Sequence, residues 1–326
     1  MPASPAIIDW LLDSDPAIRW QVMRDLLDAP EVAWRAERAR VEGEGWGARM
    51  LAARDPDGQW AGAAFWDEAV DWHRREETGQ PWTATCWALS DLREFGLDPD
   101  SDSARQTVAL VGANSRWEEG GQPFWEGEVE ECINGRTVAS GAYFGVDVGP
   151  IVARLLGERQ PDGGWNCERA NGSVRSSFDT TINVLEGLLE FERAAGRSSE
   201  VAEARRSGEE FLLSRCLYRR LSTGAPADPD YLRLTHPKRW RHDFLRGLDY
   251  FRAAGVRDPR LAEPIAELRR RRLPDGCWPL DRTLRGRVWF PVEGAPGEPS
   301  RWITLRALRV LRWWDASGSA AERSQW

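Results

Sequence analysis

The sequence predicts an all-α protein folded as a single (α/α)6 toroid of six helical hairpins. Helical apolar periodicity and capping signals recur along the 326 residues, whereas period-two alternation is absent. The motif Arg-x-Pro-Asp-Gly-x-Trp (PDGxW) occurs at Arg54–Trp60, Arg159–Trp165 and Arg272–Trp278. Because an internal repeat indicates one repeated architecture, we expect one domain over residues 1–316 and a polar tail over 317–326.

The predicted helices can be placed in order from their caps and periodicity. Ser14–Pro16 supplies an N-cap and a first-turn proline, and Gly96 closes a later helix. The expected helices are Ile7–Leu12, Ala17–Leu27, Glu31–Val41, Trp46–Ala53, Trp82–Leu97, Asp98–Val111, Cys132–Val146, Gly149–Arg159, Ser176–Gly196, Glu200–Arg220, His236–Gly255, Asp258–Arg272 and Gly297–Trp314.

Six of these helices begin just after a loop with small or aromatic residues and alternate with more charged helices. They open near Ala17, Thr83, Ile133, Phe178, Arg239 and Ser300. We expect them to be parallel inner helices, so that their N-termini and the long loops gather at one end, where a pocket would open. In each PDGxW copy, Pro, Asp and Gly predict a tight turn whose Trp packs back against the neighbouring helices.

Composition limits the functional classes. Hydrophobic residues make up 41% of the chain, and the net charge of −8 argues against nucleic-acid binding. The five cysteines include no CxxC pair, which favours a reduced, cytoplasmic protein. Neither a signal peptide nor a transmembrane segment is predicted, and the sequence does not indicate an oligomeric state.

PDGxW followed by a helix opening with PSRWITLRAL at Pro299–Leu308 resembles the QW-type repeats of the terpene-cyclase and protein prenyltransferase toroid superfamily. The resemblance covers nearly the whole chain and is closest to small bacterial squalene-cyclase-like proteins, also described as prenyltransferase/squalene-oxidase repeat proteins. It implies the toroid and a prenyl-derived, terpenoid or similarly apolar substrate. Fold alone does not specify the chemistry.

The chain departs from that family at three points. Arg54, Arg159 and Arg272 stand where the QW repeat has glutamine, so the repeat is QW-like. The Asp-x-Asp-Asp acid motif of class II cyclases is absent: Phe178 occupies the protonating position and Asp179 the last one. The zinc ligands of protein prenyltransferases cannot all be placed. A full triterpene cyclase is therefore not expected.

The most specific group of candidate residues is Cys132, Cys167 and Asp179, with His242 or His236 as a fourth member. The first three should lie at the same end of neighbouring hairpins, and thiolate, carboxylate and imidazole groups bind zinc. The alternative is that the cysteines are small buried apolar residues and Asp179 caps a helix.

Asp179 can also be read as a general acid, because a carboxyl group among aromatic rings stays protonated. His242, beside Asp243, and Cys167 complete the predicted catalytic residues. His242 could equally be a surface or capping residue, since neighbours in sequence do not face each other on a helix.

Aromatic residues near the inner helix starts predict a lined central cavity for an apolar molecule, although packing alone also accounts for them. The predicted substrate-binding residues are Trp20, Trp82, Cys132, Trp165, Phe178, Trp240, Trp302 and Arg306. No clear diphosphate motif is present, although Arg239, Arg241, Arg301 and Arg306 could supply one.

The sequence therefore favours a cyclase or isomerase acting on an apolar or prenyl-derived substrate. A zinc-dependent toroid enzyme is one alternative. The acidic, Trp-bearing loop Phe124–Glu131 supports a second, a carbohydrate-active (α/α)6 enzyme. The third is a non-catalytic binding scaffold.

Overall fold

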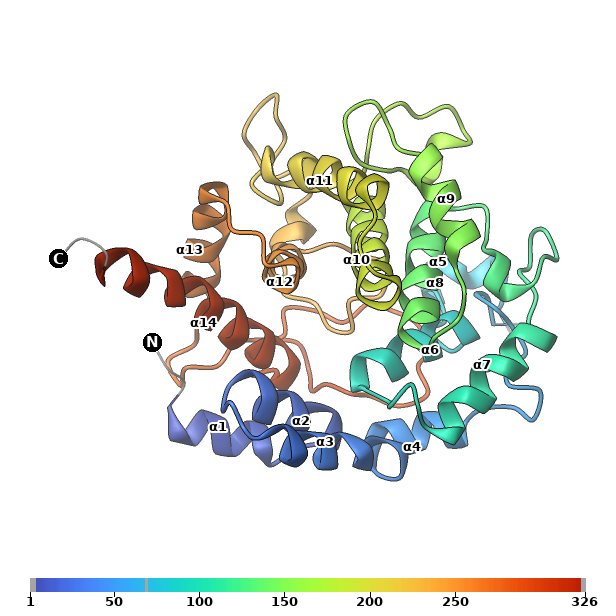
Figure 1. Ribbon diagram of the computed structural model, residues 1–326, viewed down its shortest axis with the longest axis horizontal. Helices are drawn as coiled ribbons and strands as arrows, with labels where there is room; N and C mark the ends of the chain where they lie inside the picture. The colour runs from blue at the N-terminus through green and yellow to red at the C-terminus, as the bar shows by residue number, and fades with distance from the viewer. Residues whose placement is uncertain (1–3, 68–69, 324–326) are drawn as a thin grey trace.

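The computed structural model describes residues 4–67 and 70–323, and within them the chain is built from α-helices (Figure 1). β-bridges in these ranges are isolated, such as that of Trp60 with Ala63, and no β-strand forms there. The prediction of an all-helical protein is confirmed.

Apart from α5, which forms where no helix was predicted, the α-helices lie close to the predicted ranges, and several, such as α1, α2 and α7, begin at a side-chain cap. They are α1 (Pro5–Leu12), α2 (Pro16–Asp25), α3 (Glu31–Ala39), α4 (Gly45–Ala52), α5 (Arg75–Thr78), α6 (Thr85–Phe95), α7 (Asp102–Asn114), α8 (Glu131–Tyr143), α9 (Gly149–Gly157), α10 (Phe178–Ala195), α11 (Ser199–Leu213), α12 (Phe244–Ala254), α13 (Ala262–Arg270) and α14 (Arg301–Arg323).

The six predicted inner helices contact one another in chain order. Helix α2 contacts α6, and contacts continue from α6 through α8, α10 and α12 to α14. Helix α14 in turn contacts α2, so the first and last inner helices lie side by side (Figure 1). The remaining helices pack against this set, for example α9 against α8, α11 against α10 and α13 against α12.

The three PDGxW copies form the same structural unit. Each glycine has a left-handed φ, between 89° and 105°, which a β-carbon would strain. Each Trp ring is fully buried and donates its indole N–H to a carbonyl on the preceding outer helix, at 2.8, 2.7 and 2.7 Å. The donor–acceptor pairs are Trp60 with Met50, Trp165 with Leu155 and Trp278 with Leu268.

The backbone N–H of each of these tryptophans donates to a threonine hydroxyl in the first turns of the next inner helix. The acceptors are Thr85 in α6, Thr181 in α10 and Thr304 in α14. The three units therefore join α4 to α6, α9 to α10 and α13 to α14.

Small residues allow α8 and α10 to approach closely, as expected from the composition of α8. A β-carbon on Gly135 would lie 2.6 Å from the Asn183 backbone, and one on Gly187 would lie 2.4 Å from the Gly135 carbonyl. Any larger side chain at either glycine would push the two helices apart.

Three predicted boundaries are wrong. Helix α12 begins at Phe244 rather than His236, because Asp243 caps it through the Arg246 N–H and residues 236–243 are irregular. Helix α11 ends at Leu213 rather than Arg220, because Cys216 and Leu217 have left-handed backbones. The polar segment 317–326 is helical up to Arg323, and 324–326 lie outside the described residues.

Two hydrophobic clusters form the core, one spanning α1, α2 and α8–α14 and the other centred on α4 and α6. Trp46 and Val292 pack against both clusters. None of the described helices has the length and apolar character needed to cross a bilayer.

Candidate functional site

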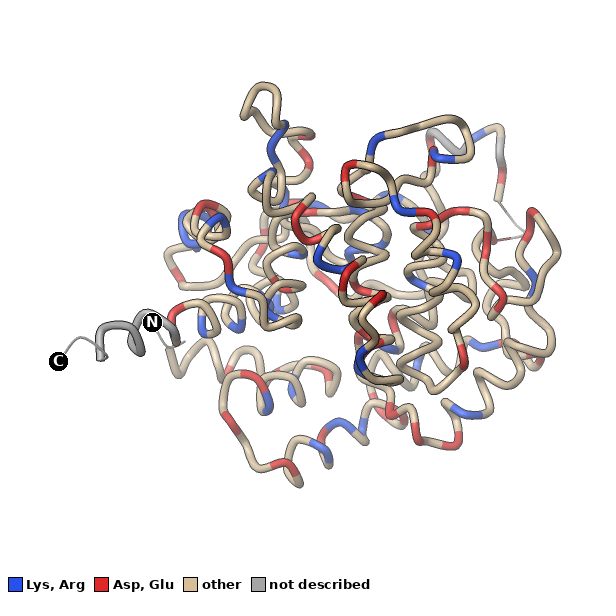
Figure 2. Tube along the Cα trace, turned by 45° about the horizontal axis from the view of Figure 1, so that its top comes forward, with Lys and Arg blue, Asp and Glu red and all other residues tan. Residues whose placement is uncertain are grey.

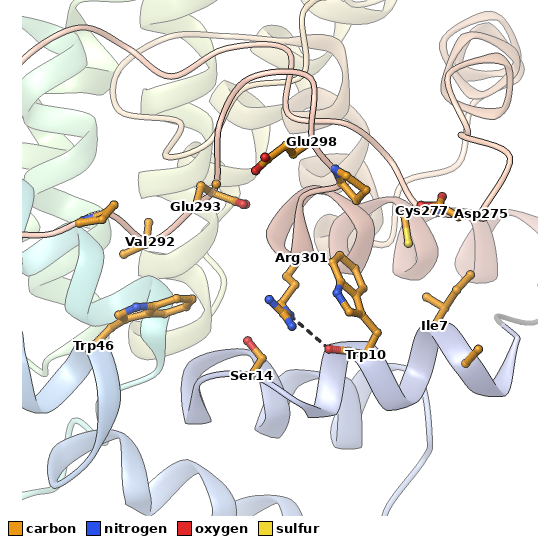
Figure 3. A pocket seen from close by; sticks show the side chains of 14 residues that line it. Ile7, Trp10, Ser14, Trp46, Asp275, Cys277, Val292, Glu293, Glu298 and Arg301 are labelled. Carbon is orange, nitrogen blue, oxygen red and sulfur yellow. Dashed lines mark hydrogen bonds between the residues drawn. The ribbon is translucent and has the colours of Figure 1, made fainter.

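A cavity of about 730 Å³ lies beside α1, at the point where the two core clusters meet. Its walls come from α1, the start of α4, the third PDGxW unit and the loop 291–301 (Figure 3). Trp10 and Ile7 from α1, Trp46 from α4 and Val292 from the loop supply its apolar surface.

Glu293 projects from that loop into this cavity (Figure 3). Its Oε1 accepts a hydrogen bond from the Ser300 hydroxyl and another, at 3.3 Å, from the Trp302 N–H at the start of α14. Burial raises the pKa of Glu293 to about 7, although these hydrogen bonds and the Arg306 charge favour the ionised form. The side chain can therefore both donate and accept a proton near neutral pH.

A second cavity of about 230 Å³ shares the segment 291–294 with the first, so Glu293 borders both. Met50, Trp82, Trp289 and Phe290 contribute apolar surface there. The half-buried Glu293 thus lies between two cavities that contain aromatic side chains, and the buried Asp91, paired with Arg239, also lines the second.

The other charged groups of the first cavity have structural partners. Arg301 donates to the carbonyls of Trp10, at 3.2 Å, and Asp13, at 3.0 Å (Figure 3). Glu298 accepts from the Ala295 N–H, and Asp275 accepts from the Cys277 N–H of the third PDGxW unit. Glu293 is the carboxyl whose raised pKa suits proton transfer.

An aromatic stack supports the floor of this site. The Trp302 ring is stacked on Trp46, with centroids 6.0 Å apart, and on His236, with centroids 4.9 Å apart. Burial lowers the pKa of His236 well below its usual value, so its imidazole is neutral. Trp302, predicted to line a substrate cavity, lies behind the cavity wall as a support.

The other predicted substrate-binding residues are dispersed. Trp82 lines the second cavity, and Trp20 lines a third, charged cavity bordered by α2, α6, α8, α10, α12 and α14. Trp165 is fully buried within its PDGxW unit, and Trp240 donates to the Gln80 side chain at 3.2 Å. Arg306 is buried and donates to Glu94 and to His236 Nδ1.

Asp179 and His242 lie together but lack the predicted geometry. The Asp179 carboxylate accepts from the His242 backbone N–H at 2.6 Å and from the Tyr231 hydroxyl at 3.2 Å. Ser177, not Asp179, caps α10. Burial raises the pKa of Asp179, but its carboxyl group lines none of the three cavities.

The His242 side chain contacts the backbone of Leu217 and does not hydrogen-bond to Asp179; only the backbone N–H of His242 does. Its Nε2 lies 2.7 Å from the Leu217 carbonyl oxygen, and the ring contacts Phe178 and Tyr231. Burial lowers the pKa of His242 to about 3, so the imidazole is neutral at physiological pH. Phe178, predicted to bind substrate, is a core residue of this cluster.

Cys132 and Cys167 are brought together as predicted, with Glu130 in place of Asp179. One ligand atom from each of Cys132, Cys167 and Glu130 lies within 4.8 Å of the other two. The Cys132 thiol donates to Glu130 at 3.4 Å, and the Cys167 sulfur lies 3.2 Å from the Thr180 hydroxyl. All five cysteines are free thiols.

Two functional candidates could not be identified from local sequence. Glu293 lies in a loop without a motif, and its environment comes from distant segments. Glu130 belongs to the acidic loop that suggested sugar chemistry, but its neighbour Glu131 is buried in an ion pair with Arg169 at 2.7 Å. Glu293 and Glu130 lie near the other site residues because the fold brings distant segments together.

Comparison with known proteins gives no assignment: no protein-family model matches the chain, and no curated protein does.

Proposed function

We propose that this protein is a proton-transfer enzyme, a cyclase or isomerase acting on an apolar or prenyl-derived small molecule. The observation that carries the proposal is the half-buried Glu293 carboxyl group, which borders two cavities that both contain aromatic side chains. We further propose that the six helical hairpins form an (α/α)6 toroid of the terpene-cyclase-like class. The continuous contacts from α2 through α14 and back to α2 support that architecture.

In the proposed reaction, the Glu293 carboxyl group donates its proton to one carbon of a substrate double bond. The neighbouring carbon becomes a carbocation, which the electron-rich ring faces of Trp10 or Trp46 stabilise through cation–π attraction. The Glu293 carboxylate then removes a proton from an adjacent carbon and regenerates the acid. The net reaction moves a double bond or, when a second double bond attacks the cation, closes a ring.

Glu293 replaces Asp179 as the proposed acid. Asp179 is held by the His242 N–H and the Tyr231 hydroxyl and borders none of the three cavities. Glu293 borders two of them, and its pKa of about 7 leaves a large protonated fraction at neutral pH.

Deuterium labelling tests this proposal across a panel of candidate substrates. The purified protein is incubated in deuterated water with unsaturated prenyl alcohols and hydrocarbons of several lengths, and the products are analysed by mass spectrometry. We expect carbon-bound deuterium in the products of the wild type and of Glu298→Gln. The rate of deuterium incorporation should fall at least 100-fold in Glu293→Gln.

Absence of deuterium from every substrate, or equal labelling by Glu293→Gln, would overturn the assignment. Thermal stabilisation by oligosaccharides but not by prenyl compounds would instead favour a carbohydrate-active enzyme. Stabilisation by neither class would favour the scaffold alternative.

A second candidate function, zinc-dependent catalysis, is favoured by the convergence of Cys132, Cys167 and Glu130. Two thiolates and a carboxylate can hold zinc with a fourth position open, where the metal would act as a Lewis acid. The three side chains come from the start of α8 and from the loop after the second PDGxW unit, so their positions depend on the fold.

Elemental analysis checks this alternative directly. Protein purified without chelator is expected to contain about one zinc per chain. The double variant Cys132→Ser, Cys167→Ser should lose the metal, whereas Cys216→Ser, whose thiol is outside the group, should retain it. A zinc content near zero in the wild type would exclude the zinc-dependent function.

A further inference from the structure

The third cavity, about 220 Å³, lies between the inner helices and differs chemically from the other two. Residues of α2, α6, α8, α10, α12 and α14 line it together with the irregular segment 237–239. Among its lining residues, basic side chains outnumber acidic ones nine to five, although the whole chain carries a net charge of −8. Elsewhere along the trace, Lys and Arg positions are interspersed with Asp and Glu (Figure 2).

Carboxylates within the cavity neutralise some of these cations. Arg239 donates to both Asp91 oxygens at 2.9 Å, and Arg246 donates to Glu186 at 2.7 and 2.9 Å. Although burial opposes ionisation, the neighbouring Arg246 and Lys238 charges hold the pKa of Glu186 well below its usual value. Both carboxyl groups are therefore already paired with an arginine, although burial raises the pKa of Asp91.

Arg136 on α8 is not neutralised in this way. It makes no ion pair with any carboxylate in the described ranges, and its buried Nε has no hydrogen-bond partner there. Its Nη1 donates to neutral oxygens, the Asn183 side chain and the Arg239 carbonyl, and its guanidinium lies 4.7 Å from the Trp87 ring centroid. Arg136 is half-buried, and removing a cation from water without a counter-ion is energetically costly.

Two further cations on the same cavity have weakly engaged donors. The buried Nε of Arg93 also has no hydrogen-bond partner within the described ranges, and its nearest ion-pair oxygen, on Glu190, is 3.8 Å away. The ammonium of Lys238, the only lysine of the chain, lies 3.8 Å from Glu94 and 3.6 Å from Glu186. Both distances exceed that of a charged hydrogen bond.

We propose that this cavity binds the phosphoryl group of a small molecule, held by Arg93, Arg136 and Lys238. Guanidinium groups match phosphate oxygens in paired hydrogen bonds, and an ammonium adds a compact positive charge. The volume of about 220 Å³ leaves room for a phosphate or diphosphate group. Exposed side chains at the cavity margin, Arg24 and Arg193, place its opening at the protein surface.

Burial disfavours the charged forms of Arg136 and Lys238 and lowers the pKa of both side chains. A bound anion would offset that penalty. Glu293 does not line this cavity and takes no part in anion binding. Phosphoryl binding and deuterium transfer can therefore each fail without the other.

Isothermal titration calorimetry with inorganic phosphate, pyrophosphate and glycerol phosphate tests the site. We expect one anion to bind per chain. Arg136→Gln and Lys238→Met should each lower the affinity at least tenfold, and added salt should also lower it. Arg312→Gln, an exposed arginine outside the cavity, should leave binding unchanged. Stronger binding of glycerol phosphate than of free phosphate would identify a phosphate ester as the ligand, and the reverse would identify the free anion.

Circular dichroism and melting temperature establish whether each variant is folded. If Arg136→Gln does not fold, Lys238→Met and Arg93→Gln provide the same test. No binding of any of the three anions to the wild type, or unchanged binding in folded variants, would overturn the proposal. Glu293→Gln should bind pyrophosphate like the wild type whatever its effect on deuterium transfer.

Discussion

At the scale of single residues, Glu293 shows how a carboxyl group acquires a function from its surroundings. Its hydrogen bonds to Ser300 and to the Trp302 N–H would stabilise the ionised form at a helix N-terminus. Burial outweighs them and raises the pKa of Glu293 to about 7. The burial comes from α1, α4 and the loop 291–301, which no local pattern brings together.

Glu293→Gln is expected to change the pH dependence of stability. The carboxyl pKa is higher in the folded than in the unfolded chain, so ionisation of the unfolded state destabilises the wild type as pH rises from about 4.5 to about 7. Across that window the variant should gain roughly 3 kcal/mol relative to wild type. Urea unfolding of both proteins at pH 4, 5.5 and 8 measures the difference.

Glu298→Gln provides the matched control, because Glu298 is exposed on the same loop. Its stability difference from wild type should not follow this pH window. A Glu293→Gln profile parallel to that of wild type would mean that folding does not raise the pKa of the Glu293 carboxyl group.

At the scale of elements, the PDGxW unit connects the helix that precedes it to the helix that follows it. In the second copy, the Trp165 indole bonds α9 and its backbone N–H bonds Thr181 in α10. The turn was predictable because Pro, Asp and Gly specify it locally. The threonine partner lies 16 residues away and was visible only in the structure.

Trp165→Ala should destabilise the protein by about 3–5 kcal/mol, because it removes a fully buried indole and its hydrogen bond. Thr181→Val keeps the shape but leaves the Trp165 N–H unpaired, at a cost of about 1–3 kcal/mol. Equilibrium denaturation measures both. Thr223→Val, on an exposed loop, should stay within about 0.5 kcal/mol of wild type, and equal effects in all three variants would contradict this role.

At the scale of the whole molecule, α14 joins the C-terminal half of the chain to the N-terminal helices. Arg309 on α14 pairs with Asp249 on α12, lies 3.5 Å from Asp25 and donates to Gln21 on α2 at 3.0 Å. Asp249 and Arg309 are both largely buried. Chain segments almost 300 residues apart in sequence are thereby held together.

Arg309→Ala is therefore expected to cost about 3 kcal/mol, because Asp249 then keeps, within the described part of the chain, a single ion-pair partner, Arg252. Arg312→Ala, one helical turn later and paired with Asp28 at the surface, should cost less than about 1 kcal/mol. Denaturation measures both stabilities, and hydrogen exchange should show faster opening of α2 in Arg309→Ala alone. Similar losses in the two variants would argue against a closing role for Arg309.

Local sequence was sufficient to predict most helices and the three PDGxW turns. Caps, prolines, glycines and apolar periodicity act within a few residues, and the Cys132–Cys167 pairing followed from equivalent positions in neighbouring hairpins. Only the tertiary structure placed Glu130 beside those cysteines, partly buried Glu293 and gathered nine basic side chains around the third cavity, among them Arg136, which has no ion pair within the described ranges. Burial and charge pairing depend on residues far apart in sequence, such as Arg306 and Glu94, and no periodic pattern records those partners.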